Sequence, residues 1–275
     1  GSTTDYMEGN VAHITINGMI LTQGSNSIFD EGTITSSKRI VRTLDTIKED
    51  DSIKGVIFEI NSPGGSGVAS DEIATAIKSL NKPTVSYIRE VGASGSYWIA
   101  SSTDYIFANK FSTVGSIGVI ASYLDFSGLL TDYNVTYQRF VAGENKDFGS
   151  PFRSPTKEEE ARYQKLLNTL HKIFIQEVAT GRNMTVAEVE KLADGSIYTG
   201  YESVDLNLID AYGGEKEAIA YMETKLNMSV DIVSYNQKST FLDSLLGVMS
   251  QQSFTIGKGI GSALSVNPTN PIFRT

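Results

Sequence analysis

The chain has 275 residues, is 40% hydrophobic and 20% charged, and is long enough to bury the core of one large domain or two modest ones. Its formal net charge of -9 argues against nucleic-acid binding, which leaves a basic footprint. The absence of cysteine excludes a thiol nucleophile, a disulfide framework and cysteine metal ligands. With only two histidines, mechanisms that require several are excluded too.

The ends of the chain differ from its middle. Gly1 and Ser2 are interpreted as a cloning remnant, which leaves room for a native signal or anchor that is absent here. No run of the sequence approaches the roughly 18 apolar residues that span a bilayer. We assign residues 1–10 to the remnant and an N-terminal arm, 11–235 to one folded domain, and 236–275 to a C-terminal arm or tail.

Short apolar runs in the first half of the chain predict strands, because they are rich in β-branched and aromatic residues and are bounded by Gly, Pro or Asn. These runs are Val11–Ile16, Gly55–Ile60, Thr84–Ile88 and Asp104–Ala108. Between them, apolar residues recur at helical spacing over 40–47, after two serines that could cap a helix (Ser36 and Ser37), and again over 68–80. Strands that alternate with helices at this pitch predict an α/β fold with a largely parallel sheet.

The second half contains two helix starts of the same kind. Thr156–Glu159 is a capping box after Pro155, and an apolar stripe follows it from Tyr163 to Val178, with Gly181 standing where a helix would stop. Thr185–Glu188 starts a second helix. Further on, Ser229–Tyr235 predicts a strand, and the tail carries a short apolar patch (Phe241, Leu242, Leu245 and Leu246) that we interpret as an arm or an interface element.

Two runs of small residues follow predicted strands. The first is Asn61–Gly67, in which adjacent glycines could expose backbone N–H groups that suit an oxyanion. Taken alone, it is better explained as a flexible loop before a helix. The second is Gly92–Ser96, which puts Ser94 at an expected helix start. Taken alone, Ser94 is better explained as a helix cap, and Ser96 departs from the G-x-S-x-G pattern of hydrolases.

A serine nucleophile needs a base. His13 lies in an alternating strand and His171 beside an apolar helical stripe, so both are interpreted as packing or surface residues. A lysine is the next candidate, if burial lowers its pKa from about 10.4 to roughly 7–8. Lys146 lies in a polar, glycine-flanked loop that by itself indicates an ordinary surface lysine.

Several motifs in one order resemble the signal peptide peptidase A family of Ser/Lys proteases. They are NSPGG at 61–65, GASGSYWIASSTDYIFANKFSTVGSIGV at 92–119, GENKDFGSPFRSPTKEE at 143–159, ADGSIYTG at 193–200 and NLIDAYGG at 207–214. The resemblance covers roughly residues 11–214. The end of the chain carries none of it.

The resemblance implies roles for individual residues. Ser94 would be the nucleophile and Lys146 the general base, supplied by one domain as in the short, unduplicated members. Ser116 matches the serine that hydrogen-bonds the lysine amine. The remaining positions would be backbone or substrate contacts: the oxyanion hole from the N–H groups of Gly65 and Gly95, and substrate binding at Gly64, Ile117 and Gly118. Ser96 and Asn145 depart from the glycine and histidine that are frequent in the family.

The family further implies a ClpP/crotonase-like fold of repeated ββα units with a long C-terminal helical extension, and no metal, nucleotide or other cofactor. Its members form ring- or dome-like homo-oligomers, anchored to a membrane with the catalytic domain outside the cytoplasm. Their substrates are extended, unfolded or membrane-released peptides such as signal-peptide remnants. Two alternatives remain open: a crotonase-like acyl-CoA enzyme, which shares the paired N–H groups but needs no Ser94/Lys146 dyad, and a non-catalytic assembly protein of the same fold.

Overall fold

A central sheet organises the protein, and the computed structural model describes residues 9–23 and 34–235. Its main path has the order β2-β1-β3-β4-β5-β8, and every pairing along that path is parallel. The strands of this path are β1 (Val11–Leu21), β2 (Ile34–Ser36), β3 (Gly55–Gly65), β4 (Thr84–Ala93), β5 (Tyr105–Ala108) and β8 (Ala211–Tyr212). The predicted α/β fold with a largely parallel sheet is confirmed. The assigned residues 1–8 and 236–275, with the apolar patch of the tail, lie outside the described residues.

Three further strands complete the sheet. β9 (Ile232–Ser234) pairs with the start of β1, where the sequence predicts a slightly longer strand. β6 (Thr113–Gly115) continues the edge of β4 beyond β5, and β7 (Ile197–Thr199) pairs with β6 in the antiparallel sense. Along the same edge, β4 therefore pairs first with β5, over residues 85–88, and then with β6, over residues 91–93.

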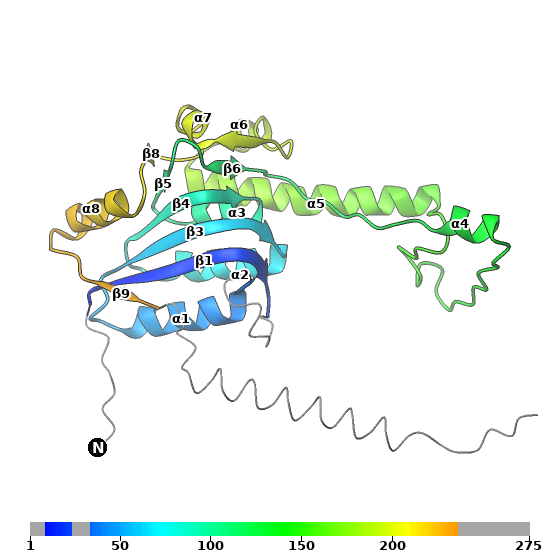
Figure 1. Ribbon diagram of the computed structural model, residues 1–275, viewed down its shortest axis with the longest axis horizontal. Helices are drawn as coiled ribbons and strands as arrows, with labels where there is room; N and C mark the ends of the chain where they lie inside the picture. The colour runs from blue at the N-terminus through cyan, green and yellow to red at the C-terminus, as the bar shows by residue number, and fades with distance from the viewer. Residues whose placement is uncertain (1–8, 24–33, 236–275) are drawn as a thin grey trace, which may run out of the picture.

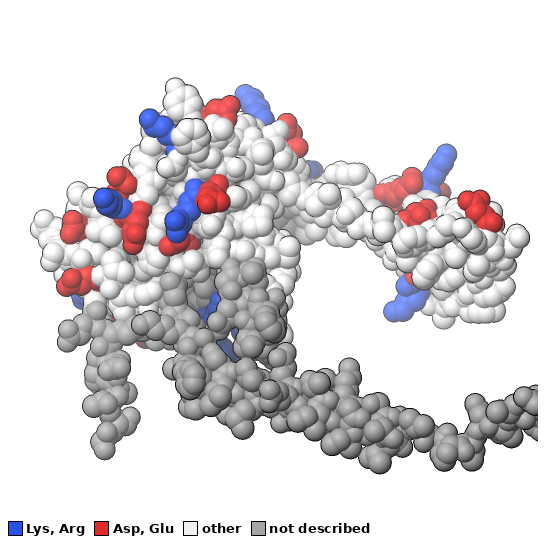
Figure 2. Space-filling view, viewed as in Figure 1, with Lys and Arg blue, Asp and Glu red and all other residues white. Residues whose placement is uncertain are grey.

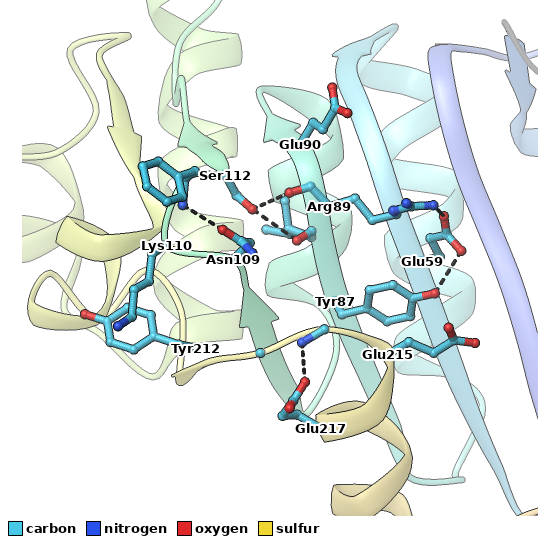
Figure 3. A pocket seen from close by; sticks show the side chains of 14 residues that line it. Glu59, Tyr87, Arg89, Glu90, Asn109, Lys110, Ser112, Tyr212, Glu215 and Glu217 are labelled. Atoms are coloured by element: carbon cyan, nitrogen blue, oxygen red, sulfur yellow. Dashed lines mark hydrogen bonds and ion pairs between the residues drawn. The ribbon is translucent and has the colours of Figure 1, made fainter.

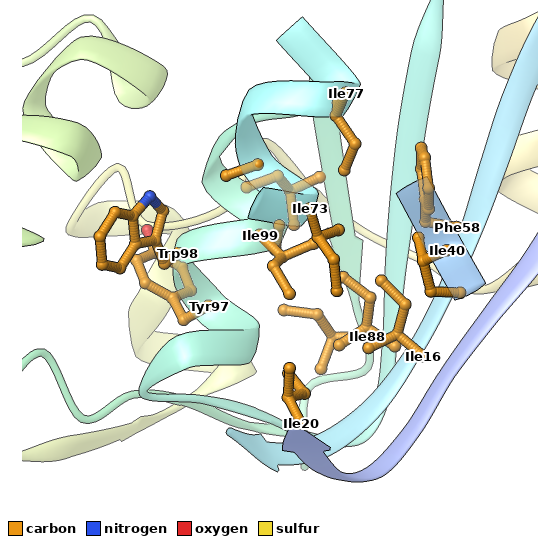
Figure 4. Close-up of a cluster of buried hydrophobic side chains, with 14 of the residues drawn as sticks. Ile16, Ile20, Ile40, Phe58, Ile73, Ile77, Ile88, Tyr97, Trp98 and Ile99 are labelled. Atoms are coloured by element: carbon orange, nitrogen blue, oxygen red, sulfur yellow. The ribbon is translucent and has the colours of Figure 1, made fainter. Parts of the chain in front are cut away.

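Both faces of the sheet are buried, as a parallel sheet requires. Side chains alternate along β3: Phe58 and its even-numbered neighbours enter the larger core with α1 (Ser37–Glu49), α2 (Gly67–Lys78) and α3 (Gly95–Ser101). Figure 4 shows this isoleucine-rich core packed between the helices and the sheet. Ile57 enters a smaller cluster under α8 (Glu215–Leu226) on the opposite face. Side-chain period and burial therefore agree over residues 56–60 of β3.

The helix starts agree with the sequence in two of three cases. The capping boxes at Thr156 and Thr185 open α5 (Lys157–Arg182) and α6 (Val186–Glu190), as predicted. Ser36 precedes α1 but makes no side-chain cap bond to that helix, which is described throughout; its hydroxyl donates to the Thr22 carbonyl instead. The other short helices are α4 (Ser127–Asp132) and α7 (Gly200–Asp205).

The predicted stop at Gly181 is wrong by one residue. α5 continues to Arg182, and Asn183 ends it in the left-handed conformation with φ 52°. Gly181 is needed for another reason: a Cβ atom there would lie 1.9 Å from the Ser101 carbonyl oxygen. The glycine therefore lets α5 approach α3 closely.

Only the second half of α5 packs on the core. Phe174 and Val178 are buried, whereas Leu166 is 51% exposed and Leu170 43% exposed. The first half projects away from the sheet, and the chain that contains α4 lies at its outer end (Figure 1). We call residues 118–173 the arm. Among the described residues, no helix has both the length and the apolar character to cross a membrane.

Candidate active site

Ser94 occupies a strained corner between β4 and α3. Its backbone has φ 54° and ψ -128°, a conformation that costs energy for any residue with a Cβ atom. Three hydrogen bonds hold it: the Ser94 N–H donates to the Gly115 carbonyl at 2.8 Å, and the Ser94 carbonyl accepts from Tyr97 at 2.9 Å and Trp98 at 3.1 Å. The half-buried hydroxyl makes no cap bond to α3, all of which is described. The interpretation of Ser94 as a simple helix cap is therefore wrong.

The glycine loop, by which we mean residues 61–66, comprises the end of β3 and the residue before α2, and it lies against this corner. Gly64 has φ 96°, and a Cβ atom on it would lie 2.7 Å from the Gly95 nitrogen and 2.9 Å from the Ser94 Cβ. A Cβ atom on Gly95 would lie 3.5 Å from the Gly65 nitrogen and 2.2 Å from the Ser70 hydroxyl oxygen. The glycines thus let two backbones touch. The two nitrogens predicted to form an oxyanion hole, those of Gly65 and Gly95, lie beside the predicted nucleophile.

The segment predicted to support the base and the substrate starts at the same place. Gly115 is in register with Ala93, so Ser116 follows directly beside the Ser94 corner. Ser116 has φ 51°, and its N–H donates to the Ser196 carbonyl at 2.8 Å. Ile117 is fully buried and Gly118 half-buried. From here the chain runs into the arm.

Lys146 is not part of this corner in the single chain. It is exposed and lies in the connection between α4 and α5, where its N–H donates to the Gly143 carbonyl at 3.0 Å. That connection lies at the outer end of α5, well separated from α3 (Figure 1). The structure therefore brings together Ser94, the glycines and Ser116, and leaves the predicted base on the arm. One copy of the domain, as described, does not supply both groups of the dyad at one point.

A network of four charges fixes the loop that carries Lys146. Asp147 accepts paired hydrogen bonds from Arg139, at 2.7 and 2.8 Å, and from Arg153, at 2.8 and 3.0 Å. Arg153 also donates to both oxygens of Glu159, at 2.7 and 2.6 Å. The two arginines hold the pKa of Asp147 well below its usual range, and Arg153, with the Thr156 N–H, lowers the pKa of Glu159 to about 2. Because Glu159 belongs to the capping box of α5, the loop is tied to the start of that helix.

This network was not predicted from the sequence. Asp147, Arg153 and Glu159 all lie in the motif at 143–159 that carries the resemblance. Opposite charges spaced through a glycine-containing loop do not reveal their partners without the fold. The charges meet only because the fold brings the loop against the first turn of α5.

Neither histidine contacts the Ser94 corner through any hydrogen bond of the described residues. His13 Nε2 lies 3.0 Å from the Tyr87 hydroxyl, which donates to Glu59 at 2.8 Å. Burial lowers the pKa of His13. His171 Nε2 lies 3.3 Å from the Ile117 carbonyl oxygen. Both positions agree with packing or surface roles.

A separate pocket of about 850 Å³ opens beside the outer part of β4. Figure 3 shows Glu59, Tyr87 and Arg89 on one side of it and Lys110 and Tyr212 on the other. Several of its charged side chains already have partners within the protein. Arg89 pairs with Glu59 at 3.0 Å, and the Lys110 amine lies 5.2 Å from the centre of the Tyr212 ring. None of the predicted site residues lines this pocket.

Comparisons with known proteins identify the family to which the chain is similar. The chain matches peptidase family S49 over residues 76–229 and the Clp protease family over residues 8–105. A Methanocaldococcus jannaschii protein provisionally named a protease is 38% identical over 227 residues, which cover 82% of this chain and 72% of that protein. The chloroplastic serine protease SPPA of Arabidopsis thaliana is 30% identical, over 78% of this chain and 33% of its own length.

Two further matches are a relative from a bacterium and a solved structure. An Enterococcus faecium protein provisionally named signal peptide peptidase SppA is 36% identical over 86% of this chain and 70% of its own length. The solved structure of a membrane-bound stomatin-specific protease superposes with a TM-score of 0.52 over 84% of this chain and 99% of that one. At 15% sequence identity, that structure supports the fold alone.

Proposed function

This chain belongs to peptidase family S49, and we propose that it is a serine endopeptidase in which Ser94 is the nucleophile and Lys146 the general base. The observation that carries the proposal is the corner itself. A strained serine, its hydroxyl not used as a cap, lies against the backbone nitrogens of two glycines. That arrangement provides a nucleophile next to fixed donors for an oxyanion.

The proposed reaction has two steps. A neutral Lys146 amine accepts the proton of the Ser94 hydroxyl while the oxygen attacks the peptide carbonyl carbon, and the N–H groups of Gly65 and Gly95 stabilise the resulting oxyanion. The peptide C–N bond then breaks, and Lys146 gives the proton that it took from Ser94 to the nitrogen of the leaving amine. In the second step water gives a proton to the neutral Lys146 amine and attacks the ester carbon. The ester C–O bond then breaks, and the Ser94 oxygen takes the proton from Lys146, which restores the free enzyme.

The position of Lys146 leads to a proposal about assembly. A lysine amine acts as a base at neutral pH only when the surrounding protein excludes water, and Lys146 is exposed in the single chain. The arm around it presents large apolar side chains to solvent: Phe140 is 90% exposed, Ile120 86% and Tyr133 75%. We propose that the arm of one copy packs against the core of the next and brings its Lys146 to the neighbour's Ser94.

This contact would join different surfaces of the two copies, namely the arm of one and the core of the other. Such head-to-tail contacts produce rings when the rotation between copies closes. A homo-oligomeric ring or dome is therefore the assembly we propose. We also propose, from the family resemblance, an N-terminal membrane anchor with the catalytic domain outside the cytoplasm.

The proposed substrates are extended, unfolded or membrane-released peptides such as signal-peptide remnants. The segment from Ser116 leaves the sheet beside Ser94, and a peptide could add there as a strand, with Ile117, Gly118 and Gly64 as neighbours. Strand addition uses main-chain hydrogen bonds, so it accepts many sequences but only extended ones.

The test is cleavage of an unfolded protein by the wild type, Ser94→Ala and Lys146→Ala. We expect the wild type to cut and both variants to lose at least about 1000-fold in rate while they keep their fold. Lys165→Ala is the matched control, because Lys165 is another exposed lysine of the arm and should retain full activity. Retained activity in Lys146→Ala would show that another base operates. If the wild type does not cut, the acyl-CoA enzyme and the assembly protein become the better explanations.

A further inference from the structure

The backbone ladder is interrupted where the glycine loop begins. The pairing of β3 with β4 shifts register between Ile60 and Ser62, and that of β1 with β3 shifts between Asn17 and Met19. Buried peptide groups at such irregularities need partners outside the regular ladder. At this point of the fold the partners are two serine hydroxyls, those of Ser62 and Ser96.

Ser62 satisfies two of these groups. It is fully buried, and its hydroxyl donates to the Gly18 carbonyl of β1 at 2.6 Å and accepts the N–H of Gly64 at 3.0 Å. One side chain therefore joins Gly18 of β1 to the glycine loop and holds the Pro63–Gly64 peptide, one peptide before the Gly65 N–H.

Ser96 joins the same loop to the nucleophile corner. It is also fully buried, and its hydroxyl oxygen lies 2.6 Å from the Ser62 carbonyl oxygen and 2.8 Å from the Ala93 carbonyl oxygen. Its single proton is shared between an acceptor in the glycine loop and the residue directly before Ser94. The bond between Ser96 and Ser62 crosses 34 positions of the sequence.

The reaction makes this link important. Oxyanion donors are effective only when they lie about 2.7–3.1 Å from the developing charge. Gly64 and Gly65, both at positive φ, have no side chains to limit their motion. The strained backbone conformation of Ser94 also persists only if the contacts around it hold it in place. A hydroxyl anchored to both segments fixes the distance between them.

We propose that Ser96, acting through Ser62, is a positioning residue that aligns the Gly65 and Gly95 N–H groups with the Ser94 hydroxyl. This inference rests on the proposed function of Ser94. Because the alignment matters most for the charged transition state, removal of the Ser96 hydroxyl should lower kcat and leave KM nearly unchanged.

The test compares Ser96→Ala with Ser101→Ala. Ser101 lies on the same helix, is 1% exposed and donates to the Trp98 carbonyl three residues earlier at 2.7 Å, but its hydroxyl has no bond to the glycine loop. Both substitutions remove one buried hydroxyl, so both should lower the unfolding midpoint by a similar few degrees. Only Ser96→Ala should lower kcat, by about tenfold to a hundredfold, and weaken a peptide boronate inhibitor by the same factor.

Equal kcat in the wild type and Ser96→Ala, or equal losses in the two variants, would overturn the proposal. Ser62→Ala provides the same readout if Ser96→Ala does not fold. Hydrogen exchange of residues 62–66 gives a readout that does not depend on activity: it should accelerate in Ser96→Ala and not in Ser101→Ala. An inactive wild type would contradict the proposed function, whereas a wild type that cuts alongside an unaffected Ser96→Ala would contradict this inference alone.

Discussion

At the scale of single residues, Gly64 lies where a side chain cannot be accommodated. Its φ of 96° is unfavourable for residues with a Cβ atom, and that atom would press on the Gly95 nitrogen, the Ala93 carbonyl oxygen and the Ser94 side chain, all within 2.9 Å. Because these neighbours are two backbone atoms and a Cβ atom, none of them can move aside as the end of a flexible side chain would. The contact between the glycine loop and the nucleophile corner therefore depends on a hydrogen atom at this position.

Gly64→Ala should destabilise the protein by about 1–3 kcal/mol and abolish labelling of Ser94 by a fluorophosphonate, because the two segments must separate. Gly67→Ala is the matched control three residues away, where a Cβ atom would meet nothing within 4 Å. Because Gly67 starts α2, alanine should leave the free energy of unfolding unchanged or raise it by up to about 1 kcal/mol. Denaturant unfolding and the labelling rate measure both effects. Normal labelling of Gly64→Ala would show that the close approach is not required.

The two small-residue corners could be found from the sequence, since they are local patterns that follow recognisable strands. Lys146 was found by family resemblance alone, because a lysine between polar residues and glycine has no local mark of function. The link between Ser96 and Ser62 was missed for a physical reason. It depends on register shifts between neighbouring strands, and no spacing within one strand reveals them.

At the scale of elements, α5 combines two different environments. Its capping box and apolar stripe were predicted from residues close together in sequence. The stripe shows which face of a helix avoids water, but not what covers it. Phe174 stacks on Trp98 with ring centres 5.3 Å apart, whereas Leu170 and Leu166, one and two turns earlier, are exposed. The exposed half of the stripe is the part of the prediction that the fold of one chain does not explain.

The charge network at the start of α5 leads to a pH prediction. The pKa of Asp147 is held below its usual range and that of Glu159 is lowered to about 2, so both carboxylates favour the ordered arm. Lowered folded-state values mean that this stabilisation is present above the unfolded pKa values near about 4 and is lost as the pH falls toward about 2. We expect the loop around Lys146 to stay ordered at pH 5 and to loosen below about pH 4.

Hydrogen exchange of residues 139–156 measures this order. Arg153→Gln should loosen the loop already at neutral pH, because it leaves Asp147 with one arginine and Glu159 with none. Arg162→Gln, a change at an exposed arginine of α5, is the control and should exchange like the wild type. A loop that loosens between pH 7 and pH 5 in the wild type would contradict this assignment of the charges.

At the scale of the whole molecule, the described chain has a folded core and a projecting arm. Figure 2 shows charges of both signs scattered over the core and clustered at the end of the arm, with wide uncharged surface between them. The fold class followed from the sequence because strand and helix periods alternate regularly. The projection of the arm could not be predicted from the sequence. A segment that packs against another molecule has the same apolar pattern as one that packs against its own core.

We propose that Ser94 and Lys146 meet, and that they come from two copies of the chain. Mixing Ser94→Ala with Lys146→Ala, each inactive alone, and allowing subunits to exchange tests it directly. Random mixing in a ring should restore about a quarter of the wild-type rate, since one contact in four joins an intact serine to an intact lysine. Mixed oligomers that form but stay inactive would contradict the account and place the base for Ser94 within its own chain.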